Sequence, residues 1–141
     1  MKTQAQVLLL LVAMALIFCP SVYAESLTTA QIKQIEEIAM AIASQHNANS
    51  EALLDDMTVS TRAVAISRNV KFLYVLRVKK GLSPSELKEY SDELRREILP
   101  NACFQNANNP AFDRGLFYTF IYKNTYGEKL AAIVVSKENC R

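Results

Sequence analysis

The chain has 141 residues, of which 16 are Lys or Arg and 14 are Asp or Glu, so its formal net charge is +2. Half of the residues are hydrophobic, which is enough for one domain with a modest core. A charge balance this close to zero gives no argument for a nucleic-acid partner or for an anionic membrane surface.

The first two dozen residues have the pattern of a secretory signal peptide. Lys2 supplies a positive charge, Val7 to Phe18 is an apolar run of 12 residues, and Val22-Tyr23-Ala24 fits a cleavage site. A membrane-spanning helix needs about 20 apolar residues, so we expect cleavage after Ala24 and no integral membrane span. Cys19 leaves a lipoprotein signal as the alternative, although the residue before it is not the Gly, Ala or Ser typical of such signals.

Cleavage would remove residues 1–24 as a signal peptide and leave one periplasmic or secreted domain, residues 25–141. That domain keeps only two cysteines, Cys103 and Cys140. Two thiols in an oxidising compartment are expected to pair as a structural disulfide. The alternative, a catalytic redox pair, usually needs Cys-x-x-Cys spacing or a neighbour that lowers the thiol pKa, and neither is visible.

The first half of the domain predicts a helix followed by a β-hairpin. Thr28 and Gln31 have the spacing of a capping box, and apolar residues then recur every three or four positions until the helix fades near His46-Asn47. The period changes to two over residues 58–66 and again over 70–78, which predicts two strands joined by a tight turn.

The second half predicts another helix and another hairpin. Ser83, Pro84 and Glu86 form a capping box with proline at the first helical position, and we expect Pro100 to end this helix. Residues 116–122 and 130–135 are strand-like segments on either side of a turn that contains Gly127.

The predicted fold class is therefore α+β in the order α-β-β-α-β-β. We expect one antiparallel four-stranded sheet with both helices on one face and one disulfide. Two separate small sheets are the alternative.

Residues with catalytic potential are few. His46 is the only histidine, and no nucleophile motif accompanies it, so we interpret it as a solvated helix end. Asp55-Asp56 lies before the first strand, where an aspartate that caps the loop is the simpler interpretation. We expect no enzyme, no metal and no cofactor.

Aromatic residues are the best functional candidates. They gather in the predicted strands and the last turn, and an exposed aromatic patch on a sheet often marks a binding surface. The candidate binding surface consists of Tyr74, Tyr118, Phe120, Tyr122 and Tyr126. The alternative is that most of these rings form the core.

Several short motifs recur in one group of proteins. They are Asp55-Asp56-x-Thr58, Phe72-x-Tyr74, Cys103, Gly115-x-x-Tyr118-x-x-x-Tyr122, Gly127 and Cys140. In these the chain resembles small secreted proteobacterial proteins, some of them labelled quorum-sensing-regulated virulence factors. The resemblance implies an α+β periplasmic or secreted protein with this disulfide and no catalytic residues.

The functional hypothesis is an exported accessory protein of the bacterial envelope. We expect it to bind another envelope or secreted protein, in a secretion, pilus or virulence-associated role. One alternative is a periplasmic immunity protein or inhibitor of a toxin or hydrolase. The other is a small hydrolase that uses His46 or Asp55-Asp56. The sequence leaves the oligomeric state open.

Overall fold

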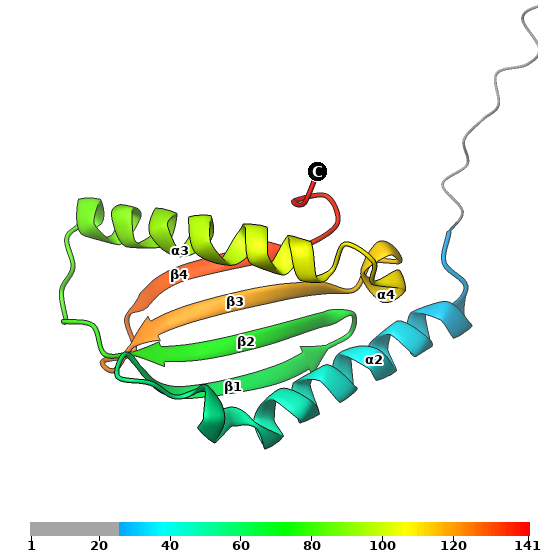
Figure 1. Ribbon diagram of the computed structural model, residues 1–141, viewed down its shortest axis with the longest axis horizontal. Helices are drawn as coiled ribbons and strands as arrows, with labels where there is room; N and C mark the ends of the chain where they lie inside the picture. The colour runs from blue at the N-terminus through cyan, green and yellow to red at the C-terminus, as the bar shows by residue number, and fades with distance from the viewer. Residues whose placement is uncertain (1–25) are drawn as a thin grey trace, which may run out of the picture.

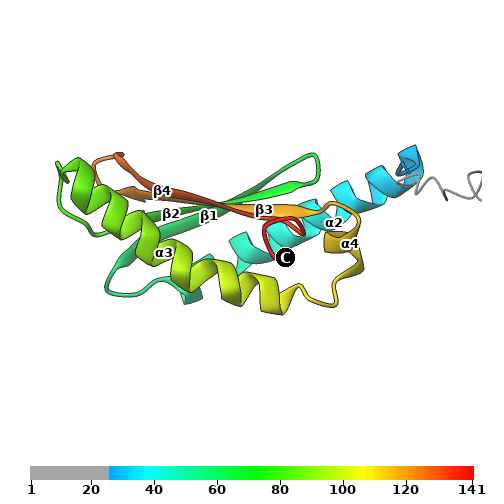
Figure 2. The same cartoon turned by 90° about the horizontal axis from the view of Figure 1, so that it is seen from above.

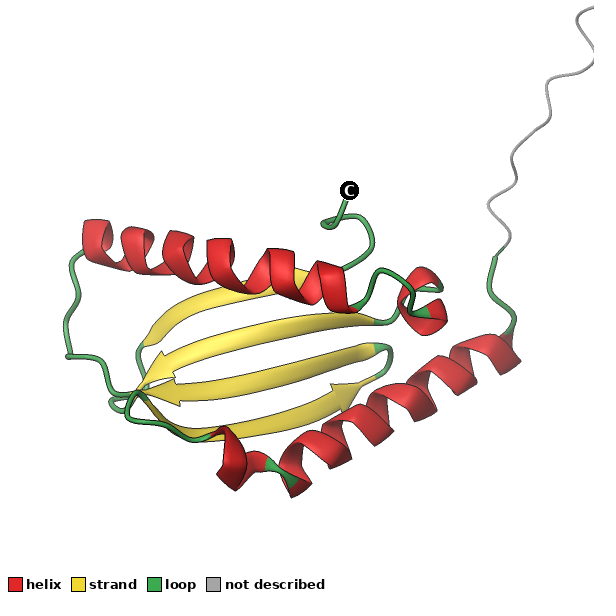
Figure 3. Cartoon of the chain, in the orientation of Figure 1, coloured by secondary structure: helices red, strands yellow, loops and turns green. Residues whose placement is uncertain are grey.

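The computed structural model describes residues 26–141, so the predicted signal peptide with its cleavage site, and Cys19, lie outside the described residues. Two long helices lie along opposite edges of a four-stranded sheet (Figures 1 and 3). The helices are α2 (Thr29–Ala48), the 3₁₀ helix η1 (Ser50–Leu53), α3 (Pro84–Gln105) and α4 (Pro110–Asp113). The strands are β1 (Thr58–Ile66), β2 (Asn69–Leu76), β3 (Phe117–Asn124) and β4 (Lys129–Val135).

Both long helices begin at the predicted capping boxes. The Thr28 hydroxyl accepts the Gln31 N–H at 3.2 Å, while the Gln31 side chain accepts the Thr28 N–H at 2.8 Å. Ser83 and Glu86 form the same reciprocal pair at the start of α3. Each box satisfies backbone donors that have no partner within the helix, so the two helix starts are determined locally.

The prediction that Pro100 ends the second helix is wrong, because α3 continues to Gln105. Proline lacks the N–H that would bond the Arg96 carbonyl, a defect that costs about 3 kcal/mol inside a helix. Pro100 is exposed, so water reaches this turn. The extra turn buries Ala102 and brings Cys103 to its disulfide partner, which offsets the defect.

The sheet has the order β1-β2-β3-β4 and is mixed rather than fully antiparallel. The two hairpins, β1–β2 and β3–β4, are antiparallel as predicted, but β2 and β3 run parallel. The reason lies in the connection. Helix α3 has 22 residues and is about 33 Å long, so it carries the chain back across the whole sheet and β3 starts at the same end as β2.

Both long helices pack on one face of the sheet, as predicted, and leave the other face uncovered (Figure 2). Most strand residues that point toward the helices are buried, with Val70, Ile133 and Val135 at 0% exposure, while Tyr74 and Phe120 are half-buried. No helix in residues 26–141 combines the length and apolar character needed to cross a bilayer.

A disulfide joins Cys103 near the end of α3 to Cys140 after β4, with 5.4 Å between the two Cα atoms. It confirms the predicted pairing. The bond closes a loop of 37 residues and ties the C-terminal segment to α3. An end that would otherwise fray is thereby held on the domain.

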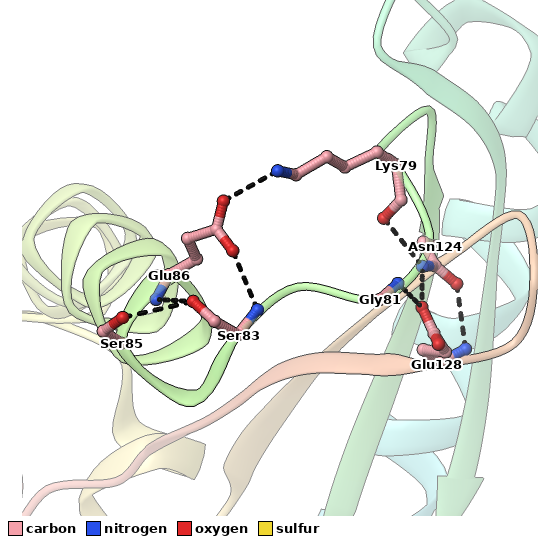
Figure 4. A network of polar contacts seen from close by, with 7 residues as sticks. All are labelled: Lys79, Gly81, Ser83, Ser85, Glu86, Asn124 and Glu128. Atoms are coloured by element: carbon pink, nitrogen blue, oxygen red, sulfur yellow. Dashed lines mark hydrogen bonds and ion pairs between the residues drawn. The ribbon is translucent and has the colours of Figure 1, made fainter.

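A polar network holds the crossover loop, residues 77–83 between β2 and α3, against the β3–β4 turn (Figure 4). Asn124, only 1% exposed, donates to the Lys79 carbonyl at 3.3 Å and to the Glu128 carboxylate at 2.6 Å. Its amide oxygen accepts the N–H groups of Tyr126 and Glu128. The Glu128 carboxylate in turn accepts the Gly81 N–H, and these bonds lower its pKa. The segment between β2 and α3 is thus fastened to the second hairpin.

At the start of α3, the same network includes an ion pair between Lys79 and Glu86 at 2.7 Å (Figure 4). The hydrogen bond from Lys79, with those from Ser83, lowers the pKa of Glu86 to about 2. The Glu86 carboxylate therefore stays ionised and keeps the cap in place over the ordinary pH range.

Replacing both Cys103 and Cys140 with Ala should lower the free energy of unfolding by about 4 kcal/mol, because the unfolded chain is no longer closed into a 37-residue loop. Urea denaturation followed by circular dichroism measures this change. Wild-type protein in reductant should behave like the double variant. Equal stability of the oxidised wild type and the variant would contradict the prediction.

The variant Asn124→Ala should lower the free energy of unfolding by about 2–3 kcal/mol, because the backbone groups of Lys79, Tyr126 and Glu128 lose their bonds to this buried side chain. The neighbouring Thr125 is exposed, so Thr125→Ala is the matched control and should leave the stability nearly unchanged. If both variants unfold at the same urea concentration as wild type, the network does not contribute to stability.

Candidate functional site

Four of the five predicted binding residues lie on the helix-covered face of the two central strands. Tyr118 and Tyr122 are buried at 7% and 5% exposure, while Tyr74 and Phe120 are half-buried. Tyr126 is 63% exposed and lies in the β3–β4 turn, apart from the others. Four of the five rings are therefore buried or half-buried on the covered face, and only Tyr126 is largely exposed.

The parallel register places four rings of β2 and β3 in two stacked pairs. Phe72 is the register partner of Phe120, and Tyr74 is the partner of Tyr122. The ring centroids are 5.0 Å apart in the first pair and 5.1 Å in the second, with nearly parallel planes. Stacked rings stabilise by more than their buried area alone. We call these four residues, Phe72, Tyr74, Phe120 and Tyr122, the aromatic seam.

The long helices cover the aromatic seam incompletely. Helix α2 packs against β1 and β2, and α3 packs against β4, so the helices lie apart over opposite edges of the sheet (Figure 1). Apolar side chains on both helices remain only partly buried. They are Ile38 and Ile42 of α2 and Leu87, Tyr90, Leu94 and Ile98 of α3. Side chains of this type, half-buried beside half-buried rings, form an apolar surface suited to an additional segment.

His46 extends this surface at the end of α2. Its Nε2 atom forms a hydrogen bond with the Thr61 hydroxyl at 2.8 Å, and its ring meets Phe72 edge-on at 4.9 Å. Burial lowers the pKa of His46. The interpretation of His46 as a solvated helix end is therefore wrong. His46 lies four residues after Ile42, so it belongs to the apolar stripe of α2. This spacing is the feature of the sequence that indicates a packed histidine.

The residue after His46 fastens α2 to the edge of the sheet. The Asn47 side chain donates to the Ala63 carbonyl at 2.9 Å and accepts the Ala63 N–H at 2.7 Å. An amide side chain thus replaces the strand partner that β1 lacks at this point. This contact and the His46 bond determine where α2 crosses β1.

The polar groups near the aromatic seam have structural partners. The Tyr118 hydroxyl donates to Asn106 at 2.9 Å, and burial raises the pKa values of Tyr74, Tyr118 and Tyr122, so all three rings stay neutral. Within residues 26–141 no group of three His, Cys, Asp or Glu side chains is placed to hold a metal ion.

Asp55 caps the loop before β1, as the sequence indicated. Its carboxylate accepts the N–H groups of Met57 and Thr58 at 2.8 and 2.5 Å, and these bonds lower its pKa. The carboxylate is therefore engaged in local backbone contacts.

Comparison with known proteins gives likenesses in structure but not in sequence. No protein-family model and no curated protein sequence matches the chain. Three solved structures share the fold. PA3611 of Pseudomonas aeruginosa, a candidate secreted protein, has a TM-score of 0.63 at 10% identity, over 81% of this chain and 99% of that one.

The other two structures are pilotins of type II secretion systems. The pilotin EpsS from Vibrio vulnificus has a TM-score of 0.51 at 15% identity, over 81% of this chain and 98% of that one. The pilotin AspS from Vibrio cholerae has a TM-score of 0.50 at 20% identity, over 79% and 96%. At these identities the likenesses show a shared fold.

Stability should fall as the pH drops from about 7 to about 5, and His46→Gln should remove most of this dependence. The pKa of His46 is lowered from 6.5 in the folded chain, so below that value the unfolded chain binds the proton more readily. The Gln side chain does not titrate.

Urea unfolding at several pH values measures this dependence. The carboxylates with lowered pKa values, such as Asp55 and Glu86, have ordinary values of 3.8 and 4.5 and lose their contribution only below this window. An equally steep pH dependence in the His46→Gln variant would show that another group is responsible.

Proposed function

We propose that the protein is an exported accessory protein of the bacterial envelope that binds an apolar segment of another envelope protein on the aromatic seam. The exported form would be residues 25–141, located in the periplasm or outside the cell. The role would be associated with protein secretion, and it requires no catalysis and no cofactor.

The observation that carries this proposal is the incomplete cover over the seam. Tyr74 and Phe120 are half-buried at the centre of the sheet, and the apolar stripes of α2 and α3 beside them are also only half-buried. A partner segment lying between the helices would complete this burial. Aromatic side chains that become fully buried near the centre of an interface often dominate its binding energy.

The structural neighbours support the same class of function. Two of the three solved structures described above are named as pilotins of type II secretion systems, and the third is a candidate secreted protein. The predicted signal peptide and the disulfide fit an oxidising compartment outside the cytoplasm. Fold alone does not define function, so the proposal depends on the seam itself.

Site-specific crosslinking tests the proposal directly. A photo-crosslinking phenylalanine derivative at position 120 keeps the aromatic ring and should trap a secretion or envelope protein in living cells. The same derivative at Ile121 is the matched control, because Ile121 is the next residue of β3 and points to the opposite face. Equal crosslinking at both positions, or none at position 120, would contradict the proposal.

The double variant Tyr74→Ala/Phe120→Ala should weaken binding of the trapped partner by about tenfold or more, because two central aromatic contacts are lost. Leu73→Ala/Ile121→Ala, which truncates a register pair on the other face of the same strands, should retain binding. Affinity is measured with the purified partner, after thermal unfolding shows that both variants are folded. If the seam variant binds as tightly as wild type, the partner lies elsewhere.

A further inference from the structure

The face of the sheet opposite the helices is uncovered (Figure 2). The strand register and the sequence place cations and aliphatic side chains on it. Directly opposite residues in neighbouring strands share a face, so the register identifies its members. One row across all four strands is Val64, Lys71, Thr119 and Val134, and a second row is Arg62, Leu73, Ile121 and Ala132. We call this surface the open face.

Every charged residue in the four strands is a cation. These are Arg62, Lys71, Lys123 and Lys129, and no strand contains Asp or Glu. None of the four forms an ion pair with another residue of 26–141. Lys123 and Lys129 are direct register partners, an arrangement of like charges that destabilises a sheet. The open face therefore concentrates positive charge at some cost to stability.

The helices carry the opposite charge. Along α2 and α3 there are seven carboxylates and four Lys or Arg residues. The net charge of the chain is close to zero, but its charges are separated in space. The open face is positive, and the two long helices carry a net negative charge. A separation of this kind orients a protein in the field of a charged surface.

The aliphatic residues of the open face are exposed between the cations. Ile66 is 53% exposed, Val134 42% and Val64 39%, while Leu73 and Ile121 are half-buried. Along the four strands this face has one aromatic ring, Phe117, which is half-buried at the end of β3. Protein interfaces are enriched in aromatic residues and depleted in lysine, so this composition does not favour a protein partner.

We propose that the open face docks on the surface of an anionic phospholipid bilayer. The aliphatic side chains would enter the region between headgroups and acyl chains, and the lysine and arginine stems would lie along it with their charges on the phosphates. The aromatic seam would then face away from the membrane and stay accessible. This inference does not depend on the partner proposed for the seam, because the two surfaces lie on opposite faces of the sheet.

Vesicle sedimentation tests the proposal with the chain recovered after export. The protein should bind vesicles of phosphatidylcholine mixed with phosphatidylglycerol, bind vesicles of phosphatidylcholine alone much more weakly, and dissociate as salt is raised. Each lysine near an anionic surface strengthens binding about fivefold, so Lys71→Gln/Lys123→Gln should weaken it about 25-fold.

The matched control removes two cations from the helices, Lys33→Gln/Arg95→Gln, and should leave vesicle binding unchanged. Circular dichroism and thermal unfolding verify that both double variants are folded. Absence of binding to the anionic vesicles, or an equal loss in the control, would overturn the proposal. If Lys71→Gln/Lys123→Gln keeps vesicle binding but loses a captured periplasmic protein, the open face belongs to a protein partner and the membrane proposal is wrong.

Discussion

The parallel pairing of β2 with β3 is the constraint on which the rest of the structure depends. This pairing places Phe72 beside Phe120 and Tyr74 beside Tyr122, so four rings stack at the centre of one face. It exists because α3 is long enough to return the chain to the starting end of the sheet. An antiparallel pairing of the same strands would set different residues opposite one another and would separate the two stacked pairs.

The same constraint divides the helices between two edges. The first hairpin carries α2 on its side of the sheet, while the crossover lays α3 over β4. Neither helix can cover the central seam alone, and the polar network around Asn124 holds the crossover loop in this arrangement (Figure 4). The disulfide then ties the far end of α3 to the segment after β4. The incomplete cover over the aromatic rings is therefore a consequence of topology.

The two faces of the sheet offer different chemistry from one set of strands. Alternation along β2 sends Phe72 and Tyr74 to one side and Lys71 and Leu73 to the other. One side is apolar and aromatic, which suits a protein segment, and the other combines cations with aliphatic groups, which suits a lipid surface. A chain with almost no net charge can thus carry two distinct surfaces. Residues that alternate along a strand point to opposite faces of the sheet, so apolar and charged side chains that are neighbours in the sequence lie on different faces.

Much of the fold could be predicted from the sequence because its determinants are local. The two capping boxes, the helix periods and the strand alternation depend on residues close in the chain, and the structure confirms them. The predicted pairing of Cys103 with Cys140 is also confirmed. The end of α3 could not be predicted from the local sequence. Proline usually ends a helix, but burial of Ala102 and the disulfide to the distant Cys140 favour one more turn after Pro100.

The sequence by itself determined the order of elements, the disulfide and the group of aromatic residues worth attention. Only the tertiary structure decided that four of these five rings lie on the helix-covered face, that His46 joins them, and that the cations gather on the uncovered face. Alternation assigns residues to two faces but cannot say which face a helix will cover. That choice depends on the parallel crossover and on contacts between segments far apart in the chain, which no local pattern encodes.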